Sequence, residues 1–214
     1  MKMLFVNGSP RKSWNTATLL SKAMEGAQLQ GAQTELVHLY DMSYKGCESC
    51  FSCKLKGGKS YGACAVNDEL APVLKKIPEI DALVLGSPIY LGAVTGLMRS
   101  FLERLTFPYL VYDAKRSSLF KRKMPVAFIY TMGAPENMIK DVGYDRQFNL
   151  MERILTRIFG GSSEWMASTD TCQFDDYTKY ESSAFDKDAK AARRKEVFPT
   201  DCQKAFDMGK RIAG

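Results

Sequence analysis

The 214-residue sequence contains a single histidine, His38, and that residue lies in a segment that alternates polar and apolar residues. A hydrolase built on a catalytic histidine is therefore disfavoured, and His38 is interpreted as structural. The sequence also lacks the G-x-S-x-G and H-E-x-x-H motifs and both common glycine-rich nucleotide loops, G-x-x-x-x-G-K-[ST] and G-x-G-x-x-G. These absences exclude the serine hydrolases, zinc proteases and nucleotide folds that depend on those motifs.

Long apolar runs are also absent, since no run approaches the roughly 20 residues that cross a bilayer. The first seven residues are typical of the start of a strand rather than of a secretion signal. We therefore expect a cytoplasmic protein with no membrane association.

The excess of positive charge is small, with 30 Lys and Arg against 24 Asp and Glu. It suits anionic small molecules and is too weak to predict nucleic-acid binding, so the basic residues of 187–195 are interpreted as a solvated helix face.

Predicted strands and helices alternate along the whole chain. The apolar segments 82–87 and 124–131 are typical of central parallel strands that are covered on both faces. This alternation predicts one α/β domain over 1–214, with a doubly wound parallel sheet and helices on both faces. The remaining predicted strands are 2–7, 34–39 and 163–169. The predicted helices are 16–30, 68–77, 95–106 and 144–159, followed by two helical pieces that Pro199 separates, the second with a capping box at Thr200 and Gln203.

The loop that follows the first strand has the composition of an anion site. It runs from Asn7 to Thr16 and precedes an amphipathic helix. The free N–H groups of a first helical turn and the hydroxyls of Ser9, Thr16 and Thr18 can converge on a phosphate, and Arg11 adds a permanently charged donor. The alternative is a strand–helix turn that binds nothing, in which Asn15 or Thr16 caps the helix.

Three loops are expected to meet at the carboxyl edge of the sheet, where ligands of such folds bind. The loop 8–16 is suited to phosphate. The loop 87–92 offers a flat aromatic and backbone surface, and 131–135 is small and contains glycine. Together they describe a site for a mononucleotide with a large flat ring.

Two segments carry a resemblance to a known family. The first, Asn7-Gly8-Ser9-Pro10-Arg11, resembles the phosphate loop of flavodoxin-like NAD(P)H-dependent FMN reductases. The second resembles their ring-binding turn and is Gly86-Ser87-Pro88-Ile89-Tyr90, followed by Gly92 and Thr95-Gly96. The resemblance is carried by residues 1–135. It implies non-covalently bound FMN, a five-stranded sheet in the order 2-1-3-4-5, and a homodimer or homotetramer with FMN near a subunit interface. The FMN-binding residues that it implies are Ser9, Arg11, Asn15, Thr16, Thr18, Pro88, Ile89, Tyr90, Leu91, Gly92, Thr131, Met132 and Gly133.

Four of the six cysteines lie in an insertion at about 41–66. The spacing of Cys47-x-x-Cys50-x-x-Cys53 suits a [4Fe–4S] cluster with Cys64 as the fourth ligand. This segment is also similar to the cysteine segment of the iron-sulfur flavoproteins in this family. Ten residues separate Cys53 from Cys64, more than is typical of those proteins. A zinc site and free or redox-active thiols remain alternatives. Cys172 and Cys202 are interpreted as packed thiols.

The resemblance implies an oxidoreductase that takes a hydride from NAD(P)H and passes electrons to a flavin, a quinone, a nitroaromatic compound or a metal complex. No catalytic side chain is expected, because the flavin performs the redox chemistry. An iron-sulfur electron carrier supplied by ferredoxin and a flavin-binding module without turnover are the alternatives. Arg116, Lys121 or Arg122 is a candidate contact for the phosphate of the nicotinamide nucleotide.

Overall fold

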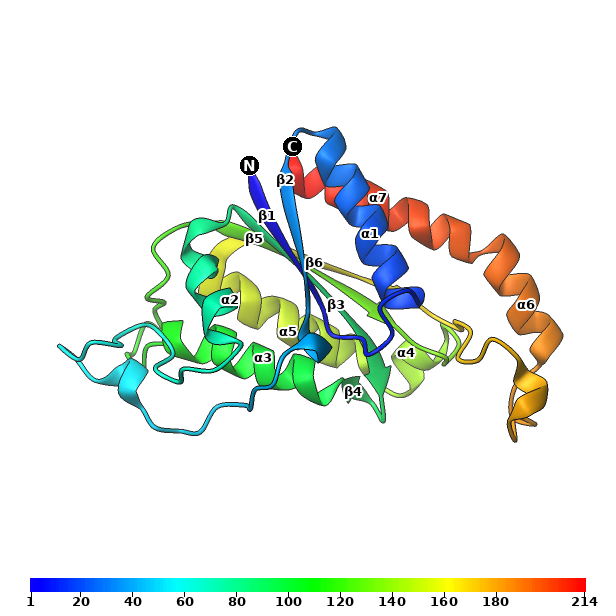
Figure 1. Cartoon of the computed structure of the whole chain (residues 1–214), viewed down its shortest axis with the longest axis horizontal. Coiled ribbons are helices and arrows are strands. Elements are labelled where there is room, and N and C mark those ends of the chain that lie inside the picture. The colour runs from blue at the N-terminus through cyan, green and yellow to red at the C-terminus, as the bar shows by residue number, and fades with distance from the viewer.

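The computed structural model describes all residues, 1–214, as a central sheet between two layers of helices (Figure 1). No helix is both long enough and apolar enough to cross a membrane. The strands are β1 Lys2–Asn7, β2 Gln33–His38, β3 Ala82–Tyr90, β4 Ala93–Val94, β5 Met124–Thr131 and β6 Gly160–Ser168. The α-helices are α1 Asn15–Leu29, α2 Ala71–Lys76, α3 Gly96–Thr106, α4 Met138–Asp141, α5 Tyr144–Phe159, α6 Lys187–Glu196 and α7 Phe198–Ala213.

The order of the main strands is β2-β1-β3-β5-β6, and every neighbouring pair is parallel. The two-residue strand β4 pairs only with β3, in the antiparallel sense. The five parallel strands, counted along the chain, therefore have the order 2-1-3-4-5, and the prediction of a doubly wound flavodoxin-like sheet is confirmed.

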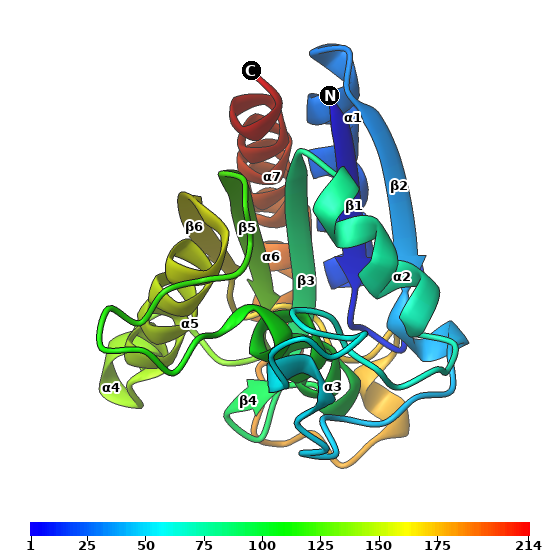
Figure 2. The ribbon, with the colours of Figure 1, turned by 90° about the vertical axis from the view of Figure 1, so that its left-hand side faces the viewer.

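Helices cover both faces of the sheet, as Figure 1 shows, and Figure 2 shows the strands side by side. The helices α2, α3 and α5 lie on one face, against one set of strand residues such as Leu83 and Leu85. The helices α1 and α7 lie on the other face, against the alternate residues such as Val84. Because successive side chains of a strand point to opposite faces, the nearly continuous apolar runs of β3 and β5 supply both cores.

Three predicted boundaries were wrong for local reasons. The helix expected at 68–77 begins only at Ala71, since the Asp68 carboxylate is bound by Arg104 and accepts from the Leu70 N–H. The strand β3 runs on to Tyr90 because β4 pairs with its end. Pro199 does not separate two helices at a loop, because it lies in the first turn of α7, where its missing N–H costs nothing. Thr200 is consequently inside α7 and caps nothing.

Glycine permits the close crossing of α1 and α7. A Cβ on Gly26 would overlap the backbone of Phe206, and one on Gly209 would overlap the backbone of Ala23. The two backbones therefore touch directly, and no larger side chain fits between them.

We expect Gly209→Ala to destabilise the fold by about 1–3 kcal/mol, because overpacking at the crossing outweighs the gain in helix propensity. Urea denaturation would measure the change in the free energy of unfolding. Gly96→Ala is the matched control, since nothing lies within 4 Å of a Cβ at that position. Equal effects of the two substitutions would contradict the crossing argument.

Candidate functional site

A cavity of about 310 Å³ opens at the carboxyl edge of the sheet, where the loops after β1, β3, β5 and β6 meet. The three loops that the sequence predicted to meet do so here, joined by a fourth loop after β6. The lining residues are Ser9, Arg11, Trp14, Asn15, Thr16, Pro88, Ile89, Tyr90, Thr131, Met132, Gly133, Thr171, Cys172, Gln173 and Phe174. All the predicted FMN-binding residues except Thr18, Leu91 and Gly92 are among them.

Backbone and side-chain hydrogen bonds fix the loop after β1. The Gly8 N–H donates to the Gly86 carbonyl at 2.8 Å, and the Thr95 hydroxyl donates to the Gly8 carbonyl at 2.7 Å. A Cβ on Gly8 would lie 2.9 Å from the Met98 side chain, so only glycine fits. The loop after β1 and the connection that leads into α3 are thus held together as one unit.

His38 and Asn7 position the start of this loop. The Asn7 amide nitrogen lies 3.0 Å from His38 Nδ1, and the Asn7 side-chain oxygen accepts from the Ser9 N–H at 2.9 Å. His38 lies at the carboxyl end of β2, outside the cavity lining. This arrangement fits the interpretation of His38 as a structural residue.

One end of the cavity collects donors suited to an anion. No side chain caps the N-terminus of α1, where the N-cap residue is Trp14. The alternative in which Asn15 or Thr16 caps the helix is therefore wrong. The N–H groups of the first turn remain available beside Ser9, Arg11 and the Thr16 hydroxyl, which lies 2.7 Å from the Thr131 hydroxyl. The guanidinium of Arg11 lies over the Trp14 ring and donates to the Gln173 carbonyl.

The other wall of the cavity is flat and largely apolar, built from Pro88, Ile89 and Tyr90 at the end of β3. Tyr90 is 48 % exposed, and its partial burial raises the pKa of the phenol, which is neutral at neutral pH. This wall combines a rigid backbone with one aromatic side chain, as the sequence predicted for the loop 87–92.

Three predicted FMN-binding residues lie outside the cavity lining. Leu91 and Gly92 have φ of +47° and +88° and form the two-residue turn between β3 and β4. The Leu91 side chain is fully exposed at the tip of that turn. Thr18 is one turn inside α1, and its hydroxyl donates to the Trp14 carbonyl at 3.0 Å. Leu91 and Gly92 thus form the tip of a hairpin that was not recognised in the sequence, outside the cavity lining.

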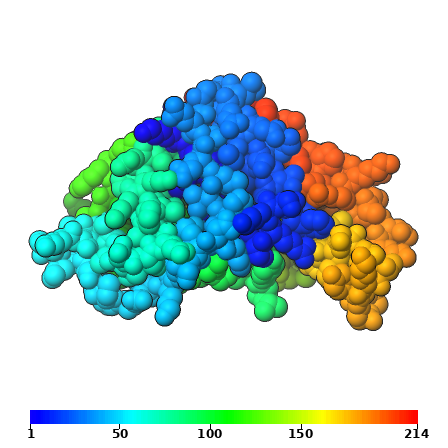
Figure 3. All heavy atoms as spheres, in the orientation of Figure 1, coloured from blue at the N-terminus to red at the C-terminus, as the bar shows by residue number.

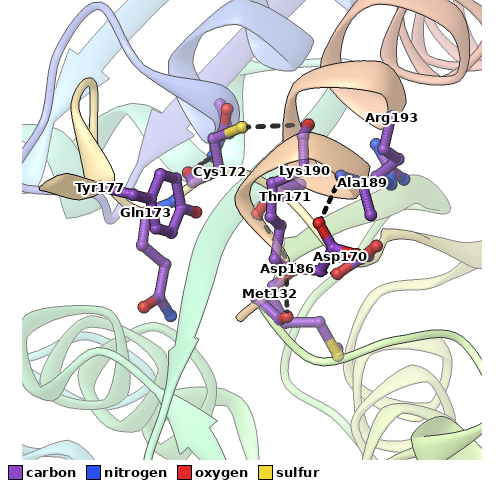
Figure 4. A network of polar contacts seen from close by, with 12 residues as sticks. Met132, Asp170, Thr171, Cys172, Gln173, Tyr177, Asp186, Ala189, Lys190 and Arg193 are labelled. Atoms are coloured by element: carbon purple, nitrogen blue, oxygen red, sulfur yellow. Dashed lines mark hydrogen bonds and ion pairs between the residues drawn. The ribbon is translucent and has the colours of Figure 1, made fainter. Parts of the chain in front are cut away.

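The sequence did not predict that the loop after β6 lines the cavity. The strand pattern of 163–169 is weak, and no recognisable motif follows it. The Cys172 carbonyl accepts from Trp14 Nε1 at 3.0 Å and from the Asn15 amide at 2.8 Å. The Thr171 hydroxyl donates to the Met132 carbonyl at 3.0 Å, which ties this loop to the loop after β5 (Figure 4). A parallel strand predicted at 163–169 already implied that its carboxyl end reaches the same edge.

The basic residues of α6 were predicted to face solvent, and for three of them this is wrong. Lys190 is buried and donates to the Gly133 carbonyl at 2.8 Å and to Asp170. Arg193 binds Asp201 at 2.7 Å, and Arg194 binds the Asn15 side-chain oxygen at 2.7 Å. Lys190 and Arg194 join α6 to residues of the cavity, as Figure 4 shows for Lys190, and Arg193 joins α6 to α7.

Arg116, Lys121 and Arg122 do not line the cavity. Arg122 binds Asp81 and the Ile80 carbonyl just before β3 begins, at the amino edge of the sheet. That edge is opposite to the cavity, so Arg122 is excluded as a contact for a nucleotide bound there.

The four cysteines of the insertion line a separate cavity of only about 20 Å³, and all six cysteines are free thiols. Cys53 is buried, Cys64 is half-buried, and Cys47 and Cys50 are exposed. No three Cys, His, Asp or Glu side chains converge closely enough to bind a single metal ion. Thiolates on the corners of a four-iron cluster stand farther apart than those around one zinc ion, whose bonds are about 2.3 Å. The four thiols thus share one lining without forming a metal-ion geometry, and the cluster, zinc and free-thiol alternatives all concern the same four residues.

The ten residues between Cys53 and Cys64 do not separate the two thiols in space. The Gly62 N–H donates to the Cys53 carbonyl at 3.0 Å, so the insert closes on itself and returns the chain to its starting point. Ser49 and Phe51 have positive φ, which curls the backbone around Cys50. The insert protrudes as a lobe at one end of the molecule, coloured cyan in Figure 3.

Residues 1–153 of the chain match the sequence model of a protein family, the NADPH-dependent FMN reductases. The chain belongs to the NADPH-dependent FMN reductase family. The match includes the loops after β1, β3 and β5 and the whole cysteine segment. The expectation of an FMN-type oxidoreductase is thereby confirmed at the level of the family, and the loop after β6 and helix α6 lie beyond the matched residues.

The chain is also similar to individual members and to solved structures. It is 40 % identical over 104 residues to an iron-sulfur flavoprotein of Archaeoglobus fulgidus, covering 49 % of this chain and 48 % of that protein. The identity to an iron-sulfur flavoprotein of Methanocaldococcus jannaschii is 34 %, covering 49 % and 51 %. The chain thus aligns with about half the length of these curated relatives.

The fold is that of flavin oxidoreductase structures. An NAD(P)H:quinone oxidoreductase from Methanothermobacter marburgensis superposes with a TM-score of 0.73 at 14 % identity, covering 99 % of this chain and 98 % of that one. An FMN-dependent NADH-azoreductase from Bacillus anthracis, in complex with FMN, has a TM-score of 0.67 at 12 % identity, and both chains are fully covered.

Asp68 forms an ion pair with the buried Arg104, and the hydrogen bonds from Arg104 lower the pKa of its carboxyl. A carboxyl with a lowered pKa stabilises the fold above its unfolded-state pKa, and the stabilisation is lost as the pH falls through its folded-state pKa. We expect Asp68→Asn to cost about 3 kcal/mol at pH 7, because it leaves a buried cation unpaired.

Urea unfolding at several pH values would measure this difference, which should begin to shrink as the pH falls through the pKa of about 4 of an unfolded aspartate, and be lost as the pH falls through the lower pKa of the folded one. Glu136→Gln removes an exposed carboxylate and is the control, expected to change little at any pH. A cost of Asp68→Asn that stays constant down to pH 3 would contradict the assignment.

Proposed function

We propose that the chain is an FMN-dependent oxidoreductase that takes a hydride from NAD(P)H and passes electrons to a flavin, a quinone or a similar small acceptor. The observation that carries this proposal is the cavity at the carboxyl edge, with anion donors at one end and a flat apolar wall at the other. That combination matches the phosphate and the ring of a flavin mononucleotide. The family membership supports the same cofactor.

The residues of the cavity fit FMN in their chemistry. Ser9, Arg11, Asn15, Thr16 and the first turn of α1 would hold the phosphate, because they combine one guanidinium with neutral donors. Pro88, Ile89 and Tyr90 would lie along the ring, and Thr131, Met132 and Gly133 would complete the far side. The chemistry that FMN would supply when bound there is to accept a hydride and to pass on electrons.

The chain itself supplies the positions of the groups that hold the cofactor. No histidine or carboxylate lines the cavity, so no side chain is assigned as a general acid or base. The half-exposed Tyr90 leaves one side of the ring wall accessible to a second substrate. Assembly as a homodimer or homotetramer is part of the proposal, and the fully exposed Leu91 beside that wall is an apolar group that such an interface would cover.

A second candidate function is that of an iron-sulfur electron carrier, in which a [4Fe–4S] cluster on Cys47, Cys50, Cys53 and Cys64 accepts electrons from ferredoxin. The observation in its favour is that all four thiols line one cavity despite the long insert. The names of the curated relatives point the same way. In this case NAD(P)H would not be the electron donor.

The deciding experiment is anaerobic purification followed by a visible spectrum, iron and sulfide assays, and titration with NADH and NADPH on the same sample. We expect stoichiometric FMN that either or both nucleotides bleach. FMN that neither nucleotide reduces, together with about four iron atoms per chain, would favour the electron carrier. FMN that neither nucleotides nor reduced ferredoxin reduce would indicate a binding module without turnover. Absence of FMN after incubation with it would refute the proposal.

Arg11→Ala should weaken FMN binding by about 1.5–3 kcal/mol, because a charged hydrogen bond to the phosphate is lost. Fluorescence quenching of free FMN by the apoprotein would measure the dissociation constant. Lys12→Ala is the control, since Lys12 forms an ion pair with Asp41 and does not line the cavity. Equal affinities of wild type and Arg11→Ala for FMN would show that Arg11 does not bind the phosphate.

A further inference from the structure

Arg104 is the largest side chain in the protein that is almost fully buried, with 2 % of its surface exposed. It lies in the last turn of α3 and lines the cavity that holds the four thiols of the insertion. A buried guanidinium is costly unless it is paired, and its contacts therefore indicate what it holds together.

These contacts join the two ends of the cysteine segment. One terminal nitrogen of Arg104 donates to the Lys45 carbonyl at 3.2 Å, two residues before Cys47. The other donates to the Val66 carbonyl at 3.3 Å, two residues after Cys64. Both nitrogens also bind the Asp68 carboxylate, at 2.5 and 2.9 Å. One planar group thus fixes the entry and the exit of the segment on α3.

A second cation holds the middle of the segment. Lys54, the neighbour of Cys53, donates to the Phe107 carbonyl, to the Leu110 carbonyl, and to the Pro108 carbonyl at 3.2 Å. Its ammonium also lies 4.5 Å from the centre of the Phe107 ring. The cysteine segment is therefore fastened to the end of α3 and the turn after it, at its two ends and its middle.

The Nε–H of Arg104 is buried and has no hydrogen-bond partner, although the guanidinium as a whole interacts with the Cys64 thiol. Such an unpaired donor is uncommon in a folded core, particularly on a charged group. Arg104 borders the cavity of four thiols, which Glu48 and Glu103 also line, so negatively charged sulfur held there would lie beside the guanidinium. The ionised thiolates and sulfides of an iron-sulfur cluster are acceptors of this kind.

We propose that Arg104 is the positioning residue of the four-cysteine cavity. Its two terminal nitrogens hold the Cys47 and Cys64 ends of the segment together, and its Nε–H and charge stabilise a sulfur-rich anion held by those thiolates. The first role concerns the protein as it stands, whereas the second rests on the iron-sulfur candidate function.

The holding role is tested by alkylation of the iron-free, FMN-loaded protein with iodoacetamide, with each cysteine quantified by peptide mass spectrometry. Loss of hydrogen bonds from a charged group corresponds to about tenfold or more in an opening equilibrium, so the half-buried Cys64, two residues before the Val66 contact, should react at least about tenfold faster in Arg104→Gln. Arg157→Gln removes an exposed helical arginine and should change nothing. Cys172, outside the segment, is the internal control.

A second variant separates this role from general unfolding. Arg104→Gln combined with Asp68→Asn leaves neither charge buried without its partner, so the fold should be preserved. The hydrogen bonds from Arg104 to the two ends of the cysteine segment are nevertheless absent. FMN content and thermal midpoint would verify folding. Rapid alkylation of Cys64 in the folded double variant, with Cys172 unchanged, supports the proposal. A wild-type rate in that variant would overturn it.

The charge role is tested on protein reconstituted with iron and sulfide, by anaerobic redox titration of the cluster. Arg104→Lys keeps the charge and should keep the wild-type midpoint potential, while Arg104→Gln should shift it to more negative values, because reduction adds a negative charge. Equal potentials in all variants would overturn the charge role. Failure of wild type to take up iron would refute the iron-sulfur candidate and the charge role together, and the alkylation result would then decide the holding role alone.

Discussion

The parallel pairing of β1 with β2 on one side and β3 on the other is the constraint on which the site depends. It places Asn7 opposite both His38 and Gly86 at the carboxyl edge. The loops that follow β1 and β3 therefore start side by side and are joined by short hydrogen bonds, such as the one from Thr95 to the Gly8 carbonyl. Because these bonds form within the protein, the polar end of the cavity is arranged before any ligand arrives, which lowers the entropy lost on binding.

The C-terminal third completes the cavity through buried cations. Lys190 reaches the Gly133 carbonyl and Arg194 reaches Asn15, so α6 is fixed against loops that precede it by many residues. Arg193 binds Asp201, whose carboxylate also accepts from the Ser168 hydroxyl at the end of β6. Buried ion pairs of this kind add little net stability, and their clearest effect is to select one arrangement of the elements that they join. Here that arrangement brings the loop 171–174 to the cavity edge.

The helix α3 is common to both cavities. Its cap residue Thr95 holds the loop after β1, and its last turn carries Arg104, which holds the cysteine segment. With a rise of about 1.5 Å per residue, these two positions are only about 14 Å apart along the helix. A single rigid element thus sets the distance between the flavin-type cavity and the four thiols. Figure 2 shows the cysteine segment in cyan at the carboxyl end of the strands, on the same edge as the loops of the larger cavity.

The sequence alone indicated the five parallel strands and the three loops at the carboxyl edge, because apolar periodicity and loop composition are local properties, whereas the strand order came from the resemblance to the FMN reductases. It also identified most of the cavity lining, from Ser9 to Gly133. The tertiary structure decided the rest. It turned Leu91 and Gly92 outward in a hairpin, placed Arg122 at the opposite edge, drew Lys190 and Arg194 inward, and returned Cys64 to Cys53. Each of these outcomes depends on a partner distant in sequence, or on a strand pairing that only the folded chain forms, and no local pattern encodes such a partner.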